Sequence, residues 1–139
     1  MNIETKSFTV KTNGHTDIID ITNDVKKIFT ESGMVEGSVL IFVPGSTAGV
    51  TTIEYEPGLL QDYPAFFEKI IPSDVNYRHN ETWHDGNGHS HVRAALQGAS
   101  FTVPFSSRKL LLGTWQQIIL VDFDARPRDR KVVVQLTGK

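Results

Sequence analysis

Hydrophobic residues follow two different periods along the chain, and most stretches show the period of strands. The segment from Ile3 to Lys11 alternates, with Phe8 and Val10 on one face, which predicts a strand. Apolar runs rich in β-branched residues predict further strands. These expected strands cover residues 18–21, 39–43, 50–55, 100–105, 109–112, 116–123 and 131–136.

Two or three other segments carry the helical period. Val25, Ile28 and Phe29 form an apolar stripe, with Thr22 as the expected N-cap and Gly33 as the expected end. A second apolar stripe covers residues 59–71, and a third, shorter one covers residues 92–97.

Prolines and glycines limit the second and third helices. Pro72 ends the second helix, and Pro64 predicts that this helix either begins near Pro64 or bends there. Gly98 ends the third. Residues 73–88 show neither period, so we expect a polar loop. The pattern predicts one α+β domain over residues 1–139, rich in mixed or antiparallel β-sheet, with two or three helices.

Composition narrows the class of protein. With 39% hydrophobic and 22% charged residues, the chain has the balance of a soluble globular protein. Its net charge of −2 provides no field that attracts nucleic acid or an anionic membrane. The polar start has no apolar signal segment, and no apolar run reaches the roughly 18 residues of a membrane span. We therefore expect a cytoplasmic protein without nucleic-acid or membrane partners.

Four of the five histidines lie between His79 and His91. Imidazole is a common metal ligand and titrates near neutral pH. His89 and His91 are two positions apart, so an extended chain, entered through Gly86-Asn87-Gly88, would place both rings on one side, whereas a helix would make them diverge. His79 would fold back as a third ligand. Because the chain has no cysteine, three histidines and a water are the expected zinc site.

Other side chains in this stretch fit supporting roles, and a plainer interpretation stays open. Asp85 or Glu81 would orient a ligating imidazole or accept a proton. The alternative is a polar surface loop in which 85–88 is only a turn. His84 follows Trp83 and is the weakest member of the cluster.

Two stretches near the centre of the chain are candidates for anion or acid–base chemistry. Residues 44–49, Pro-Gly-Ser-Thr-Ala-Gly, follow a predicted strand, and their backbone N–H groups would hold an anion, or they form a plain turn. Glu54 lies among apolar neighbours on the next strand. It is either a ligand or base, or an edge-strand carboxylate in water.

Two further candidates lie in the C-terminal third. Thr114 and Gln116 flank Trp115 and would line a pocket, while Trp115 itself is expected in the core or an interface. Arg126, Arg128 and Arg130 follow two aspartates, and guanidinium groups favour phosphate or carboxylate. The alternative is a solvated turn in which these arginines pair with the aspartates.

Four motifs occur in a familiar order: Asp85-Gly-Asn-Gly-His-Ser-His91, Ser100-x-x-Val-Pro104, Gly113-Thr-Trp-Gln116 and Arg126-Pro-Arg128. In this the chain resembles the YjbQ-like family, catalogued as secondary thiamine-phosphate synthase enzymes. The resemblance implies a β-rich α+β fold, a homotrimer, and a histidine-lined site near subunit contacts.

Some residues of this chain match the motifs of the family, and others depart from them. His79 matches the family's Tyr-x-His-Asn pattern, and His89 and His91 match its Gly-His-x-His. Glu54 matches a glutamate near the end of another motif. Many members read His-Thr-Thr where this chain has Gly45-Ser-Thr47, so any role of that histidine is absent here. His84 falls outside the family pattern.

These observations predict a metal-dependent enzyme acting on a small phosphorylated substrate, with thiamine-phosphate formation as the version that the resemblance implies. The metal would be zinc, or Mg²⁺ if thiamine-phosphate synthesis is the reaction. The alternative is a non-catalytic trimer that binds a small anion or a metal. The expected metal ligands are His79, His89 and His91, the expected catalytic groups are Glu54 and Asp85, and the expected substrate contacts are Ser46, Thr47, Asn87, Thr114, Gln116 and Arg128.

Overall fold

Strand β7, Gln116–Asp122, lies at the centre of the molecule and is buried on both faces from Ile118 onward. In the computed structural model, which describes all 139 residues, it pairs antiparallel with β2, Asp17–Asp20, and with β4, Ala48–Glu54. Ile118 and Leu120 face one apolar core, and Ile119 and Val121 face a second. A strand covered on both sides needs an unbroken apolar run, which explains the sequence of this segment.

A five-stranded antiparallel sheet forms the larger layer. Its strand order is β1-β8-β3-β5-β6. The strands are β1 at Asn2–Thr12, β3 at Gly37–Phe42, β5 at Ser100–Ser106, β6 at Lys109–Leu110 and β8 at Arg128–Gly138. The larger core lies between this sheet, helix α1 at Thr22–Ser32 and one face of the three-stranded sheet.

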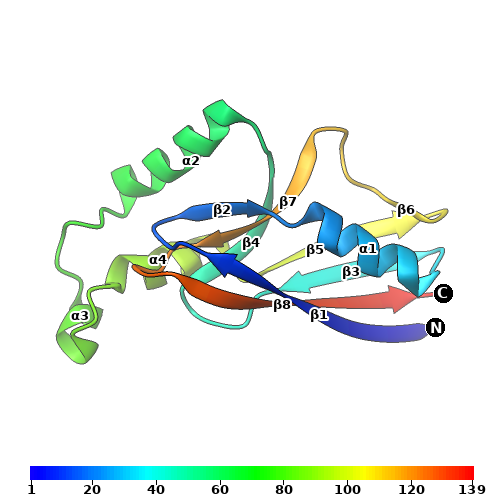
Figure 1. Cartoon of the computed structure of the whole chain (residues 1–139), viewed down its shortest axis with the longest axis horizontal. Coiled ribbons are helices and arrows are strands. Elements are labelled where there is room, and N and C mark those ends of the chain that lie inside the picture. Colours follow the sequence, from blue (N-terminus) through cyan, green and yellow to red (C-terminus); the bar gives the residue numbers. More distant parts are fainter.

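The remaining helices cluster beside the three-stranded sheet. Helix α2, Pro57–Ile70, and helix α4, Gly88–Gln97, cover its outer face with Phe67, Ile71 and Ala94 (Figure 1). Helix α3, Arg78–Trp83, lies at the end of the molecule farthest from the two termini (Figure 1). No helix is long and apolar enough to cross a membrane.

The fold class predicted from the sequence is confirmed, with corrections to its helices. There are four helices, because the segment expected to be a polar loop contains α3. Helix α2 begins at Pro57, where the Glu56 side chain accepts hydrogen bonds from Gly58 N and Leu59 N, so the expectation of a start near Pro64 is wrong. Pro64 is tolerated inside the helix, where it removes a single backbone donor.

The two ends of α1 differ in how well they were predicted. Gly33 ends the helix with φ 68°, as expected for a left-handed C-cap. Thr22 is not the N-cap, since Ile21 holds that position. The Thr22 hydroxyl instead accepts a hydrogen bond of 2.8 Å from Ile118 N, which joins α1 to β7.

Candidate functional site

A polar cavity of about 410 Å³ lies where five segments meet. These are the loop after β3, helix α3, the loop between α3 and α4, helix α4 and the start of β8. The lining residues are Gly45, Ser46, Thr47, His79, Trp83, Asp85, Asn87, His91, Arg128 and Arg130. A neighbouring cleft of about 390 Å³ shares Asp85, Asn87 and Arg128 with it, so the two form one continuous depression.

Two imidazoles and a carboxylate stand together on the helical side of this cavity. The ring centroids of His79 and His91 are 4.1 Å apart, and the rings are tilted by 42°. Asp85 Oδ1 lies 3.5 Å from His79 Nε2, close enough for an ion pair but without a hydrogen bond, so this buried nitrogen has no hydrogen-bond partner. Burial, together with the adjacent His79, lowers the pKa of His91. His91 is therefore neutral at pH 7 and able to accept a proton.

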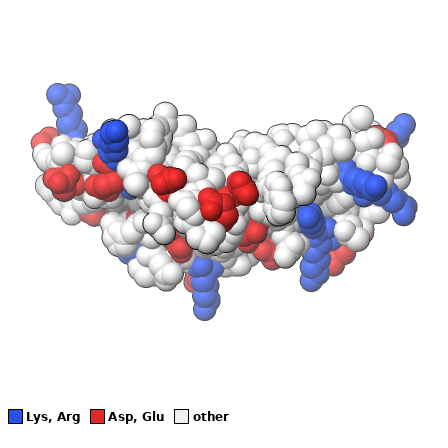
Figure 2. Space-filling model, turned by 90° about the horizontal axis from the view of Figure 1, so that it is seen from above, with Lys and Arg blue, Asp and Glu red and all other residues white.

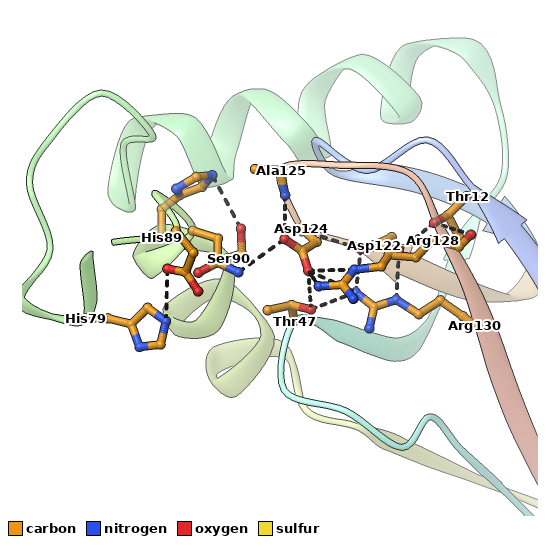
Figure 3. A network of polar contacts seen from close by, with 12 residues as sticks. Thr12, Thr47, His79, His89, Ser90, Asp122, Asp124, Ala125, Arg128 and Arg130 are labelled. Carbon is orange, nitrogen blue, oxygen red and sulfur yellow. Dashed lines mark hydrogen bonds and ion pairs between the residues drawn. The ribbon is translucent and has the colours of Figure 1, made fainter. Parts of the chain in front are cut away.

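His89 lies away from this pair, which corrects the expected three-histidine arrangement. Helix α4 already begins at Gly88, so His89 and His91 are both helical and their directions differ by about 200°. The His89 ring is buried beside Tyr77, with ring centroids 6.3 Å apart. Figure 3 shows the His79 and His89 rings well apart and pointing in different directions. The extended entry that would have aligned the two rings does not form.

A zinc site of the kind expected from the sequence would need three protein side chains close together. No three His, Asp or Glu side chains are arranged to hold an ion. The residues therefore do not fit a site of three protein ligands. The chemistry that the structure does place together is an imidazole pair beside Asp85, facing an arginine across the cavity.

Asp124 organises the opposite wall, as Figure 3 shows. Its side chain is 2% exposed and accepts hydrogen bonds from Asn87 Nδ2 at 3.2 Å, Thr47 Oγ1 at 3.1 Å, and Arg128 Nε and Nη2 at 3.0 and 2.6 Å. Burial alone raises the pKa of Asp124, but donation from Asn87, the Ala125 backbone, Arg128 and Thr47 outweighs it and holds the value at about 2. A permanent carboxylate therefore fixes three cavity side chains in place.

Next to Asp124 lies a second ion pair, which is almost completely buried. Arg130 donates through Nε and Nη2 to both oxygens of Asp122, each at 2.8 Å, and Thr12 Oγ1 adds a bond of 2.6 Å to Asp122. Arg130 Nη2 also donates to Thr47 Oγ1 at 2.7 Å. Burial opposes ionisation of Asp122, but the donors lower its pKa overall. This pair ties β8 and β1 to the loop that carries Thr47.

The start of α4 is held by close packing at Gly88. Its N–H donates to Asn80 Oδ1 at 2.9 Å, which joins α4 to α3. A Cβ on Gly88 would collide with the Tyr77 side chain. The position thus requires glycine for space, and the close approach brings His79 and His91 onto one wall.

The structure brings together most, but not all, of the expected site residues. Ser46, Thr47, Asp85, Asn87 and Arg128 all line the histidine cavity. Among them, Thr47 is buried and its hydroxyl is occupied by Arg130 and Asp124, while Ser46 is exposed.

Three expected residues lie elsewhere. Glu54 is exposed at the far end of β4, roughly 20 Å along the strand from Ala48, and lines none of the cavities described here. Thr114 and Gln116 line a different cavity. All three lie far from the histidines because β4 and β7 pair antiparallel. Glu54 lies opposite Gln116 at one end of this pair, and Ala48 lies opposite Asp122 at the other end.

Sequence reasoning missed the organising role of Asp122, Asp124 and Arg130. The aspartates were expected at most as partners in a solvated turn, yet both are buried, as is Arg130. Their alternation at the end of a fully apolar strand was the available signal, because carboxylates so placed enter the interior and need buried cations. His84 is exposed and caps α3 in the left-handed conformation with φ 57°, outside the cavity lining.

Comparisons with known proteins agree with this fold. The family model of the UPF0047 protein YjbQ-like matches residues 6–139, and the chain belongs to this family. A UPF0047 protein of Archaeoglobus fulgidus is 40% identical over 92% of this chain and 97% of its own. UPF0047 protein YugU of Bacillus subtilis is 34% identical, with 96% and 98% covered.

Solved structures show the same architecture. A YbjQ-like protein of unknown function from Sulfolobus solfataricus has a TM-score of 0.94 at 33% identity, covering 99% of both chains. A protein of the YjbQ/UPF0047 family from Clostridium acetobutylicum has a TM-score of 0.87 at 40% identity, covering 95% of this chain and 99% of its own.

Proposed function

We propose that the histidine cavity binds a small phosphorylated molecule and is the active site of an enzyme of phosphoester or pyrophosphate chemistry. The observation that carries this proposal is one cavity of about 410 Å³ in which Arg128 and the His79–His91 pair face each other. Arg128 binds Asp124 through Nε and Nη2, which leaves Nη1 for a phosphate oxygen. The exposed Ser46 hydroxyl is a further donor.

The two histidines have different surroundings, which suits acid–base catalysis. His91 has a lowered pKa and accepts a proton from the attacking nucleophile. His79 Nε2 lies 3.5 Å from Asp85 Oδ1, and in this proposal the carboxylate favours the protonated ring that donates to the leaving oxygen. Thiamine-phosphate formation, which releases pyrophosphate, is the family-implied member of this reaction class and belongs in the substrate panel.

Binding of a divalent metal is an alternative to this acid–base role, because an imidazole nitrogen that binds an ion cannot also accept or donate a proton. His79 and His91 are the two protein ligands that zinc would find here, with substrate and water completing its coordination, while Mg²⁺ would depend on substrate phosphates. The test is metal content of tag-free protein. Stoichiometric metal that is lost in His91→Ala and retained in His89→Ala supports this pair, and the opposite pattern overturns it.

Activity is tested on phosphate monoesters, pyrophosphate and thiamine precursors. His91→Gln is expected to lower turnover by roughly 10²-fold or more, because His91 accepts a proton during the reaction. Arg128→Gln is expected to raise KM, because Arg128 holds the phosphate. His84→Asn is the matched control, since it keeps the left-handed cap and lies outside the cavity lining.

The outcomes separate the two functions expected from the sequence. Turnover that survives in His91→Gln overturns the acid–base assignment. Phosphate binding without turnover of any substrate supports the non-catalytic alternative. The ion pair of Asp122 with Arg130, which lines the cavity, favours this alternative because it makes the wall rigid. The family-implied homotrimer is part of either proposal and is tested by light scattering.

A further inference from the structure

A second cavity, of about 430 Å³, lies at the other end of β7 from the histidines. Asp122 at one end of β7 pairs with Arg130, which lines the histidine cavity, and Gln116 and Gln117 at the other end line the second cavity. The seven residues of β7 therefore separate the two cavities by roughly 20 Å. The second cavity is lined by Lys26, Phe29, Thr30, Arg108, Lys109, Leu110, Leu112, Gly113, Thr114, Gln116 and Gln117. It contains Thr114 and Gln116, for which the proposed function has no use.

The lining of this cavity has one sign of charge. Lys26 from α1 and Arg108 and Lys109 from the β5–β6 hairpin contribute three cations, and no carboxylate lines the cavity. None of the three forms an ion pair with an acidic group of the protein. Figure 2 shows several Lys and Arg side chains at the right-hand end, where Figure 1 places α1 and β6, together with a few acidic groups. Cations that converge without a protein partner attract an anion.

The hairpin that carries two of these cations is held in a fixed shape. Ser107 and Arg108 both have positive φ, 51° and 60°, which is unfavourable for side chains of this kind. Ser107 N donates to Glu36 Oε1 at 2.8 Å, and Arg108 N donates to the Val35 carbonyl at 3.2 Å. These contacts to the loop before β3 hold the turn, and so hold the base of the Arg108 side chain beside the cavity.

The facing wall is also ordered. Gly113 N donates to Gln116 Oε1 at 3.0 Å, and Gln116 Nε2 donates to Thr52 Oγ1 at 2.9 Å. Gln116 is therefore a support of the loop, while the Thr30 and Thr114 hydroxyls and the Gln117 amide remain as neutral donors.

We propose that this cavity is a second binding site, selective for a small phosphorylated anion, with Lys26, Arg108 and Lys109 as its charged contacts. Apolar walls of Phe29, Leu110 and Leu112 accommodate an uncharged portion of the same molecule. The site is separate from the proposed active site and does not depend on it.

The two tryptophans allow ligand binding at each site to be followed separately by fluorescence. Trp83 lines the histidine cavity, and Trp115, which is 71% exposed, lies between two residues of the second cavity. Trp83→Phe protein is titrated with pyrophosphate, following Trp115 fluorescence and, in parallel, the heat of binding. Lys26→Gln or Arg108→Gln in this background is expected to weaken Kd roughly fivefold each, since each removes one partly solvated charge contact.

Lys27→Gln is the matched control, because Lys27 is the next residue on α1, is exposed and does not line the cavity. An unchanged Kd in Lys27→Gln beside a weakened Kd in Lys26→Gln supports the site. An equal loss of affinity in Lys26→Gln and Lys27→Gln would show general charge attraction and would overturn the proposed site. The proposal is also overturned if neither fluorescence nor calorimetry detects binding that depends on Lys26. The Trp115→Phe background, with Arg128→Gln, reports separately on the histidine cavity, so failure of one site is distinguishable from failure of the other.

Discussion

Replacing Asp124 by asparagine tests whether this carboxylate holds the histidine cavity together. The substitution keeps size and shape but removes the charge that Arg128 and Asn87 contact. Asp124 is 2% exposed, and its pKa is about 2 instead of 3.8. A shift of roughly two units corresponds to about 2.5 kcal/mol, so Asp124→Asn is expected to lower the free energy of unfolding at pH 7 by about that amount.

The pH dependence gives this prediction its sign. Because the folded pKa is lowered, the stabilisation is present above pH 4 and is lost as the pH falls from about 4 to about 2. The difference between parent and variant should therefore shrink to about half near pH 3, because at that pH the unfolded parent chain has largely bound its proton while the folded parent has not. Below that pH the two proteins converge.

Urea denaturation followed by far-UV circular dichroism measures this difference at pH 7, 4 and 3. Protein concentration is kept constant, because an oligomer unfolds in a concentration-dependent way. Asp129→Asn is the control: Asp129 is exposed on β8 and forms no ion pair, so its loss should cost less than about 0.5 kcal/mol. A variant at Asp124 that is as stable as the parent at pH 7, or a difference that does not change with pH, would refute the reasoning.

Two further predictions concern the start of α4. Burial lowers the pKa of His89, so the unfolded chain takes up a proton first and stability falls as the pH drops below about 6.5. His89→Gln should flatten the fall of Tm between pH 7 and pH 5 in scanning calorimetry, and an unchanged slope would contradict this. Gly88→Ala should cost about 1–3 kcal/mol because its Cβ meets Tyr77, whereas Gly113→Ala, whose Cβ meets nothing closer than 3.6 Å, should be nearly neutral. Equal urea midpoints for the two alanine variants would show that Gly88 is not required for space.

Local signals in the sequence were sufficient for most of the fold. The apolar residues of segment 116–123 predicted a strand, and the structure places this strand between two cores. Two helix ends were predicted wrongly, because Thr22 and Pro64 are residue types typical of helix starts. Thr22 instead bonds to β7, and the Glu56 cap starts α2 before Pro64. Alternation and helical period are properties of neighbouring residues, so they are visible without tertiary contacts.

The candidate site was predicted in part. The segment 79–91 and the arginines after β7 do meet at one cavity, as the density of polar groups suggested. The structure does not bring the three expected histidines together, because their alignment depended on whether α4 began before or after His89. Glu54, Thr114 and Gln116 were assigned to the same site as the histidines only because of their side-chain chemistry. The directions of β4 and β7 place them at the other end of the molecule.

By itself, then, the sequence determined the β-rich α+β class, the strand at residues 116–123 and the stretch in which the histidines lie. Only the tertiary structure decided which of these side chains meet: His79 with His91, Asp124 with Arg128, and three cations at a second cavity. The physical reason is that the sequence states the chemical type of each side chain directly. The residues that this side chain contacts depend instead on the phase of its helix or the register of its strand. A shift of one residue in either turns a side chain to a different face.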